Sequence, residues 1–269
     1  MRRRQFSTLV AVAVLAGAMV IAAPVGSARP VEGADGSIVA GSVPTSLLAM
    51  DTLPRELRGK AWERVPTRKK VVALTFDAGG GSGGVRKVLR TLKAEGVPAT
   101  FFLTGRWART FPGKTKRIAK GGYPLGNHTE THGKVPSMSN ARLRSELRST
   151  EKAIRAAAGR GTGPWFRFPY GSHTPRDIER LNDLGYACVQ WTVDTAGWMG
   201  TSGGMSVTSV VDRVVRALRP GAIVLMHVGE HPTDGSTLDA DALPLIIDEL
   251  RDRGYDFTTV DALRGSRGG

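Results

Sequence analysis

The stretch that decides the fold is VVALTFDAGGGSGG, residues 71–84. Five of its first six residues are apolar or aromatic, which predicts a fully buried strand. The strand runs into Asp77, and a glycine-rich run follows it. A carboxylate at the carboxyl end of a buried strand, with glycines beside it, is a common position for catalytic residues. A second interpretation is an aspartate that only caps the following turn.

Strand and helix patterns alternate from Val71 onward. After the first strand we expect strands at Ala99–Thr104, Tyr123–Leu125, Trp165–Phe168, Tyr186–Val193, Ala222–Met226 and Asp256–Val260. Helices are expected from about Val85 to Gly96, and at Pro112–Lys120, Ala141–Ala158, Thr174–Gly185, Val207–Leu218 and Leu243–Arg253. About seven strands that alternate with helices predict parallel strands joined by right-handed crossovers.

Two architectures fit this alternation: a distorted (β/α)7 barrel and an open doubly wound sheet. No Gly-x-Gly-x-x-Gly dinucleotide signature follows the first strand, and its absence favours the α/β barrel.

The N-terminus has the layout of an export signal. Arg2, Arg3 and Arg4 precede an apolar run at 9–23, and small residues at 26–28 offer a cleavage site. The run is short for a membrane span, and no second candidate span follows, so we expect no transmembrane span in the mature form. Arg3-Arg4-Gln5-Phe6 also resembles the twin-arginine pattern, so both the Sec and the twin-arginine routes stay open. The sequence therefore predicts a secreted, extracytoplasmic protein.

The sequence is strongly basic. Removal of residues 1–28 takes away three of 38 basic residues and none of the 24 acidic ones, which leaves 35 − 24 = +11. Such a charge suits an anionic surface such as a cell wall. Export and the lack of a basic-aromatic motif argue against nucleic acid as the partner. The single cysteine, Cys188, lies in an apolar run and is expected to be a buried thiol, so no intrachain disulfide forms.

The composition suggests four segments. Residues 1–28 form the export signal, and residues 29–67 form a linker or an N-terminal strap in which Leu47, Leu48, Leu57 and Trp62 are available for burial. Residues 68–264 form the domain, and 265–269 a disordered tail. We expect a monomer.

Polar residues gather after the predicted strands. All five histidines follow strands, on what would be the C-terminal face of a barrel: His128, His132, His173, His227 and His231. Asp77 and Asp194 lie there too. Their gathering on one face favours an active site there.

His128-Thr-Glu-Thr-His132 is the sharpest local pattern. If the segment is helical, residues four apart share one face, and two imidazoles there can bind a divalent metal. A capping or hydrogen-bonding pair of histidines is the alternative. Arg167, between two phenylalanines at a strand end, is placed to orient Asp77 if the two are buried together.

Five ordered stretches resemble the polysaccharide deacetylases of the NodB-homology type, carbohydrate esterase family 4, over residues 71–260. They are TFDAG at 75–79, HTETH at 128–132, RFPYG at 167–171, DTAGW at 194–198 and LMH at 225–227. The family fold is a distorted (β/α) barrel of about seven strands.

The resemblance implies a role for each matched residue. His128 and His132 would bind a divalent metal, zinc or a substitute such as cobalt. Asp77 would be the general base, oriented by Arg167, and His227 would protonate the departing amine. The backbone N–H of Tyr170 would stabilise the oxyanion, while Trp198 and Leu225 would wall the acetyl pocket.

The first departure from the family pattern lies at Ala78. The family usually has TFDDG, whose second aspartate is the third metal ligand, and alanine cannot replace it. Candidate substitutes are Asp77, Glu130 and Asp234, and a two-histidine site should bind metal weakly.

The second departure lies at Gly197. The family usually has an aspartate here, immediately before the tryptophan, and that aspartate is the partner of the last-motif histidine. Asp194 or a residue of the loop at 231–241 could serve instead. We expect this polar loop to cover the active site.

The resulting hypothesis is an exported, metal-dependent deacetylase acting on an N-acetylated glycan, most plausibly peptidoglycan, with chitin-like oligomers as another substrate. A non-catalytic glycan-binding relative is the main alternative. A glycosidase using Asp77 and Asp194 is a third, but it leaves the histidine pair unexplained.

Overall fold

A computed structural model describes residues 53–265. The predicted export signal at 1–28, the segment 29–52 and residues 266–269 of the tail lie outside the described residues. None of the described helices is long and apolar enough to span a membrane.

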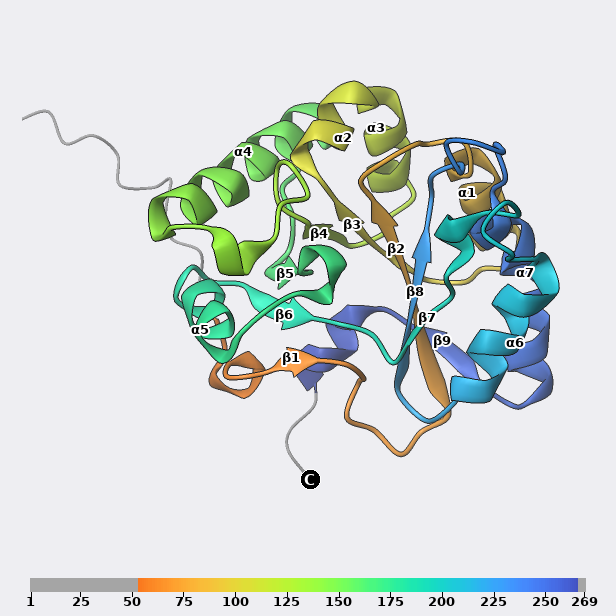
Figure 1. Cartoon of the computed structure of the whole chain (residues 1–269). Helices are drawn as coiled ribbons and strands as arrows, with labels where there is room; N and C mark the ends of the chain where they lie inside the picture. The colour runs from red at the N-terminus through yellow and green to blue at the C-terminus, as the bar shows by residue number, and fades with distance from the viewer. Residues whose placement is uncertain (1–52, 266–269) are drawn as a thin grey trace, which may run out of the picture. The chain divides into compact units, whose positions relative to one another are not determined.

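One sheet of parallel strands forms the centre of the domain (Figure 1). The strands are β1 (Ala61–Trp62), β2 (Val71–Ala78), β3 (Thr100–Leu103), β4 (Leu125–Asn127), β5 (Trp165–Phe166), β6 (Ala187–Val189), β7 (Val193–Asp194), β8 (Ala222–His227) and β9 (Asp256–Thr258). Their order is β1-β6-β5-β4-β3-β2-β8-β7, with β9 beside β2. The sheet curls into a half-closed barrel, so the expected distorted (β/α)7 barrel is confirmed and the open doubly wound sheet is wrong.

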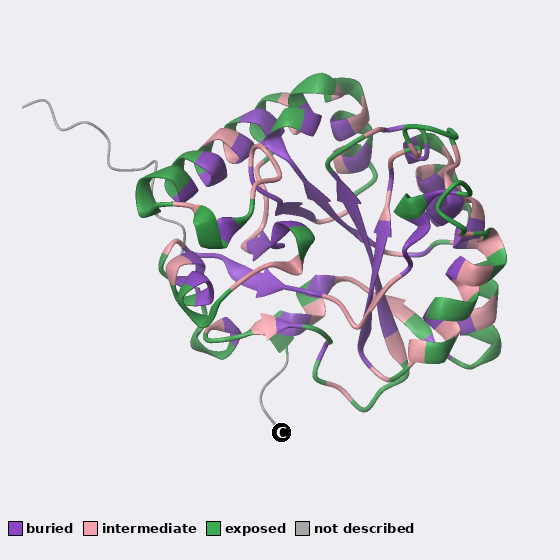
Figure 2. Ribbon diagram, viewed as in Figure 1, coloured by how far each residue is buried: buried purple, intermediate pink, exposed green. Residues whose placement is uncertain are grey.

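Helices cover the outer surface of the sheet. They are α1 (Val85–Ala94), α2 (Gly105–Thr110), α3 (Pro112–Lys120), α4 (Asn140–Ala158), α5 (Pro175–Asp183), α6 (Val207–Ala217) and α7 (Leu238–Asp252). Figure 1 shows α2, α3 and α4 on one side of the sheet and α1, α6 and α7 on the other. Figure 2 shows that strands β2 to β6 and β8 are almost wholly buried, whereas β7 and β9 are partly exposed and the helices expose their outer faces.

Strand β2 occupies the central position in the sheet. It pairs with β3 and β8, and its first three residues also pair with β9. The β2–β8 register places Asp77 opposite His227, so two of the predicted catalytic residues lie side by side at the carboxyl ends of neighbouring strands.

Local sequence determines where several helices begin. The Ser139 side chain accepts a hydrogen bond from the Arg142 N–H at the start of α4. Thr174 forms a capping box with Asp177, and Pro175 lies in the first turn of α5, where it costs no backbone hydrogen bond. These two helix starts were predictable from the sequence.

The described part of the 29–67 segment packs on the domain. It contains the short 3-10 helix η2 (Arg55–Leu57) and β1, which pairs with β6. Leu53, Leu57, Trp62 and Val65 are buried in one apolar cluster. From Leu53 onward, this segment therefore packs on the domain through apolar side chains.

Three elements differ from the sequence-based expectation. The expected strand Tyr186–Val193 is two strands, β6 and β7, because Arg167 takes the carbonyl groups of Val189 and Gln190 between them. Helix α7 begins at Leu238, five residues before the expected start, so the loop at 231–241 is shorter than predicted. Helix α2 was not expected at all.

Candidate active site

Asp77 lies at the carboxyl end of β2 in a buried ion pair with Arg167. Arg167 Nη1 donates to Asp77 Oδ1 at 2.8 Å, and the two side chains are 0% and 7% exposed. Burial alone would raise the pKa of Asp77, but the charges of Arg167, His128 and His227 lower it below its ordinary value of 3.8. Asp77 is therefore ionised at neutral pH and fixed in one orientation.

The Arg167 guanidinium is fully bonded in the interior. Besides Asp77, it donates to Thr75 Oγ1 at 2.9 Å, to the Val189 carbonyl at 3.3 Å and to the Gln190 carbonyl at 3.1 Å. The guanidinium carbon also lies 4.1 Å from the centre of the Phe102 ring. These contacts fix the arginine, so its orientation does not depend on Asp77 alone.

His128 and His132 face each other, with their Nε2 atoms 3.1 Å apart. His128 Nδ1 lies 2.8 Å from the Arg167 carbonyl oxygen. Because a carbonyl only accepts, Nδ1 carries the proton and Nε2 presents its lone pair toward His132. Burial lowers the pKa of His128, and burial together with His128 lowers the pKa of His132 to about 4. Both rings are therefore neutral at pH 7, the form that binds metals.

The segment that carries these histidines is not a helix. Thr129 and His132 have positive φ angles of 63° and 59°, and the segment is an irregular loop after β4. The helical geometry under which the two histidines would share one face is therefore not present, but the two rings nevertheless lie together. The chain reverses direction between the two histidines, and this reversal brings their rings together.

Two side chains hold this loop in place of helical hydrogen bonds. Asn127 Oδ1 accepts from the Thr129 N–H at 3.0 Å. The Glu146 carboxylate, 2% exposed, accepts from the N–H groups of Glu130 and Thr131 at 2.8 Å each. Glu146 was not among the predicted site residues. Its signal in the sequence is a carboxylate on the apolar face of α4.

The histidine pair fits a divalent metal. Two nitrogen ligands of a tetrahedral zinc ion, each about 2.0–2.1 Å from it, lie about 3.3 Å apart. The observed Nε2–Nε2 spacing of 3.1 Å is close to this value, and Asp77 Oδ2 lies 3.3 Å from His128 Nε2. The residues that the structure describes contain no group of three or more His, Cys, Asp or Glu side chains with metal-site geometry.

The other candidates for a third ligand are directed elsewhere. Ala78 is 1% exposed and belongs to the largest apolar cluster. The Glu130 carboxylate pairs with Arg109. Asp234 accepts hydrogen bonds from Thr201 and Ser202, away from the histidine pair. Of the substitutes considered, only Asp77 lies beside the histidines.

His227 ends strand β8 next to Asp77 and contacts Asp239, a residue of the 231–241 segment that was expected to offer a partner as an alternative to Asp194. Its Nδ1 lies 3.4 Å from Asp239 Oδ2, and its backbone N–H donates to the same oxygen at 2.7 Å. Burial alone would lower the pKa of His227, but Asp239, Asp77 and Asp194 raise it above the ordinary 6.5. The ring is therefore suited to carry a proton into the site.

Asp194 shapes the turn after β7. Its Oδ1 accepts from the Ala196 N–H at 2.8 Å, and its Oδ2 accepts from Trp198 Nε1 at 3.3 Å. The Trp198 ring is 54% exposed and lies with its centre 6.4 Å from that of His227. Asp194 thus orients Trp198. Leu225 on β8 is buried and is the register partner of Asp194.

Tyr170 lies opposite, in the short 3-10 helix η4 (Pro169–Gly171). Its ring is 66% exposed and packs edge-on against His132, with the ring centres 4.6 Å apart. Two exposed aromatic rings therefore border the histidines and Asp77: Tyr170 packs against His132, and Trp198 lies near His227.

Backbone strain collects in the same loops. Four non-glycine residues of the described chain have positive φ angles: Thr129, His132, Tyr170 and Ala196. They lie in the HTETH, RFPYG and DTAGW stretches. Such conformations cost about 1–3 kcal/mol each and concentrate at functional sites.

The other two histidines lie outside this group. The His173 ring stacks on Phe168, and its Nδ1 lies 2.9 Å from the Gly171 carbonyl oxygen. His231 Nδ1 lies 3.3 Å from Asp234 Oδ2 in the segment after β8. The expectation that all five histidines follow strands holds, but only three of them face Asp77.

The glycine run after Asp77 makes room for another loop. Glu230 Oε2 accepts from the N–H groups of Ser82 and Gly83, at 2.6 and 2.5 Å. A Cβ atom at Gly81 would overlap this carboxylate. Glu230 thereby ties the loop after β8 to the loop after β2.

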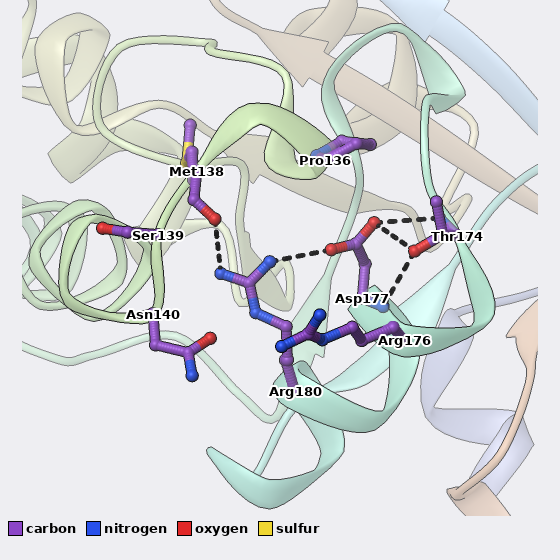
Figure 3. A pocket seen from close by; sticks show the side chains of 8 residues that line it. All are labelled: Pro136, Met138, Ser139, Asn140, Thr174, Arg176, Asp177 and Arg180. Atoms are coloured by element: carbon purple, nitrogen blue, oxygen red, sulfur yellow. Dashed lines mark hydrogen bonds and ion pairs between the residues drawn. The ribbon is translucent and has the colours of Figure 1, made fainter.

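A hollow of about 270 Å³ lies beside the site, between η3 (Val135–Ser137) and the start of α5 (Figure 3). Arg180 crosses it, donating to Asp177 Oδ1 at 2.9 Å and to the Met138 carbonyl at 2.8 Å. Asp177 also accepts from Thr174. These groups satisfy one another and join α5 to the segment after His132, so the hollow has a structural explanation.

The sequence model of the polysaccharide deacetylase family matches residues 64–189. A peptidoglycan-N-acetylglucosamine deacetylase of Bacillus cereus is 34% identical over 200 residues, which cover 74% of this chain and 70% of that protein. A chitooligosaccharide deacetylase of Bradyrhizobium is also 34% identical over 200 residues, 71% of this chain and 90% of its own length.

A solved structure of the same family is similar to this chain over most of its length. The crystal structure of a carbohydrate esterase family 4 pseudoenzyme from Bacillus anthracis superposes with a TM-score of 0.69 at 31% identity, covering 76% of this chain and 69% of that one. A half-closed barrel with a buried Asp-Arg pair and two facing histidines defines the class of protein. The chain belongs to the polysaccharide deacetylase family, a family of hydrolases.

Proposed function

We propose that this protein is an exported deacetylase that removes N-acetyl groups from peptidoglycan with the help of a divalent metal. The observation that carries the proposal is the ionised, arginine-paired Asp77 beside two neutral histidines whose Nε2 atoms face each other. The peptidoglycan deacetylase relative, the N-terminal export pattern and the basic charge support peptidoglycan as the substrate.

The reaction adds water to an amide carbonyl and breaks its C–N bond, which gives acetate and a free amine on the sugar. When bound by His128 and His132, a divalent metal supplies Lewis-acid chemistry and lowers the pKa of water. Asp77 accepts a proton from the water as general base, and Arg167 keeps its carboxylate ionised and oriented.

The remaining residues act on the carbonyl and on the leaving group. The backbone N–H of Tyr170 donates a hydrogen bond to the oxyanion, in a turn fixed by its positive φ angle of 60°. His227 donates a proton to the departing nitrogen. Trp198 and Leu225 wall the acetyl group, and the exposed faces of Tyr170 and Trp198 contact the sugar chain.

The test combines metal content with acetate release. The protein is stripped with chelator and assayed on N-acetylglucosamine oligomers and on peptidoglycan, with zinc, cobalt or no metal added. We expect metal-dependent acetate release that His128→Ala and Asp77→Asn abolish. Release that is unaffected by chelator would contradict the roles of His128 and His132.

A second candidate function is glycan binding without catalysis. Ala78 in place of the usual aspartate, together with the structural similarity to a pseudoenzyme, favours it. Ala78→Asp separates the two: a wild-type chain that binds oligomers but releases no acetate, and a variant that releases it, would establish the non-catalytic function.

A further inference from the structure

Asp239, in the first turn of α7, is a buried carboxylate that connects three elements. It is 3% exposed. Thr195 Oγ1 donates to its Oδ1 at 2.6 Å, and the His227 N–H donates to its Oδ2 at 2.7 Å. The His227 ring nitrogen Nδ1 lies 3.4 Å from the same Oδ2. The carboxylate is therefore fixed by two loops and lies against the imidazole.

Gly197 lies directly against the Asp239 carboxylate. A Cβ atom built on Gly197 would lie 2.6 Å from the Asp239 carboxyl carbon, well inside any real contact. Gly197 is absent from the glycines with positive φ angles, so its backbone would accept other residues. The requirement for glycine here is one of space, because Asp239 occupies the volume of the missing side chain.

In the described part of the chain, the other carboxylates near the ring are bound to other groups. Asp77 and Asp194 contribute charge to the surroundings of His227. Asp77 is paired with Arg167 through Oδ1, and its Oδ2 lies beside His128. Asp194 is bonded to the Ala196 N–H and to the Trp198 indole. Among the described residues, Asp239 is the carboxylate within 3.4 Å of His227 Nδ1.

We propose that Asp239 is the positioning residue for His227, supplied by α7 in place of the side chain that Gly197 lacks. The inference rests on the proposed function, in which His227 is the proton donor, and adds Asp239 as the residue that orients it. The Asp239 carboxylate keeps the proton of His227 on Nδ1, so that the other ring nitrogen, Nε2, exchanges a proton with the substrate. A carboxylate from either position 197 or position 239 fills the same space, but not both at once.

The experiment uses the full metal-loaded chain with variants Asp239→Asn, Asp239→Ala, Gly197→Asp and the double variant Gly197→Asp/Asp239→Ala. Asp241→Asn is the matched control, because Asp241 lies in the same helical turn but pairs with Lys87. Acetate release from N-acetylglucosamine oligomers gives kcat and KM. Imidazole 15N NMR reports the tautomer of His227, assigned with His227→Gln.

We expect Asp239→Asn to lower kcat by about 10-fold or more with little change in KM, and to move the His227 Nδ1 resonance. Gly197→Asp alone should lower activity, because two carboxylates compete for one space. The kcat of the double variant should be about 10-fold higher than that of Asp239→Ala. Circular dichroism identifies any variant that fails to fold. If Asp239→Ala does not fold, the isosteric variant Asp239→Asn still tests the proposal.

Wild-type kcat in Asp239→Asn, or an unchanged His227 resonance in that variant, would overturn the proposal. An equal loss of kcat in Asp241→Asn would also overturn it. The loss would then follow from removing any negative charge at the start of α7, and not from the contact between Asp239 and His227. If the wild-type chain releases no acetate, the proposed function fails, but the NMR comparison still decides whether Asp239 fixes the His227 tautomer.

Discussion

At the residue scale, the site depends on one charge held in the interior by another. Arg167 is wholly buried and Asp77 nearly so. Such a pair contributes little net stability by itself, but removal of one partner leaves an uncompensated buried charge. The sequence predicted both residues, since an arginine between two phenylalanines is hard to solvate. It could not predict the other three acceptors of Arg167, which are Thr75 on β2 and the carbonyl groups of Val189 and Gln190, because they come from segments distant in sequence.

Arg167→Ala should destabilise the domain by about 3–5 kcal/mol, because Asp77 would remain buried without its counter-ion. Urea unfolding monitored by tryptophan fluorescence measures the change. Arg155→Ala is the control, since its pair with Glu151 is exposed and should contribute only about 0–1 kcal/mol. Equal losses in the two variants would contradict the assignment.

The pKa shifts also predict the pH dependence of kcat/KM. Asp77 must be ionised to accept a proton, and its pKa lies below 3.8. Protonation of Asp77 should therefore lower kcat/KM only at pH values below 3.8. His227 must be protonated to donate one, and its raised pKa keeps it protonated to above pH 6.5, so the rate falls as pH rises through that pKa. His227→Gln should remove the alkaline limb. A rate that climbs steadily from pH 6 to 9 would contradict this assignment.

At the element scale, sequence patterns predicted which elements exist better than the geometry of the loops between them. Ser139 and Thr174 cap the helices that they were expected to start. The spacing of His128 and His132 suggested a helix, but the side chains of Asn127 and Glu146 bind the backbone of that loop instead. Glu146 comes from another element, so local spacing carried no trace of it.

The start of α7 shows the same limit. The sequence pattern predicted a helix from Leu243 to Arg253. The helix instead begins at Leu238 and contains Pro244 in its interior. The earlier start places Asp239 in the first turn of α7, where it contacts His227. A residue of the loop at 231–241 was one of the expected partners of His227, but the sequence alone did not distinguish Asp239 from the other carboxylates of that loop.

Glu146→Gln should loosen the histidine loop without unfolding α4. The amide accepts fewer strong hydrogen bonds from the Glu130 and Thr131 N–H groups, so we expect zinc affinity to fall about 10-fold. Competition with a chelating dye measures it. Glu151→Gln on the same helix is the control, because Glu151 bonds Thr162 at the far end. Unchanged zinc affinity in Glu146→Gln would show that the loop needs no such support.

At the scale of the whole domain, the strap before β2 extends the folded unit toward the N-terminus. The expected domain start at residue 68 leaves out Leu53, Leu57, Trp62 and Val65, all of which are buried. Leu57 and Trp62 were expected to be available for burial, but a segment rich in proline, glycine and charge, with little periodicity in its apolar residues, suits a linker as well as a strap.

A chain that begins at Arg68 should therefore be less stable than one that begins at Leu53. Loss of Trp62 alone is expected to cost about 3–5 kcal/mol, because it is almost fully buried in the second apolar cluster. Thermal unfolding of the two chains, with Trp62→Ala in the longer one, measures the contribution. Equal midpoints would show that the strap is dispensable.

The central place of β2 also determines when the site can form during synthesis. Asp77 leaves the ribosome early, but its strand gains its last neighbour only when β9, near the end of the described chain, has been made. Pairings so distant in sequence form slowly and late. The nascent chain thus stays without its completed sheet until translation is almost over. Asp77 therefore takes its final position in the completed sheet only after β9 has been made.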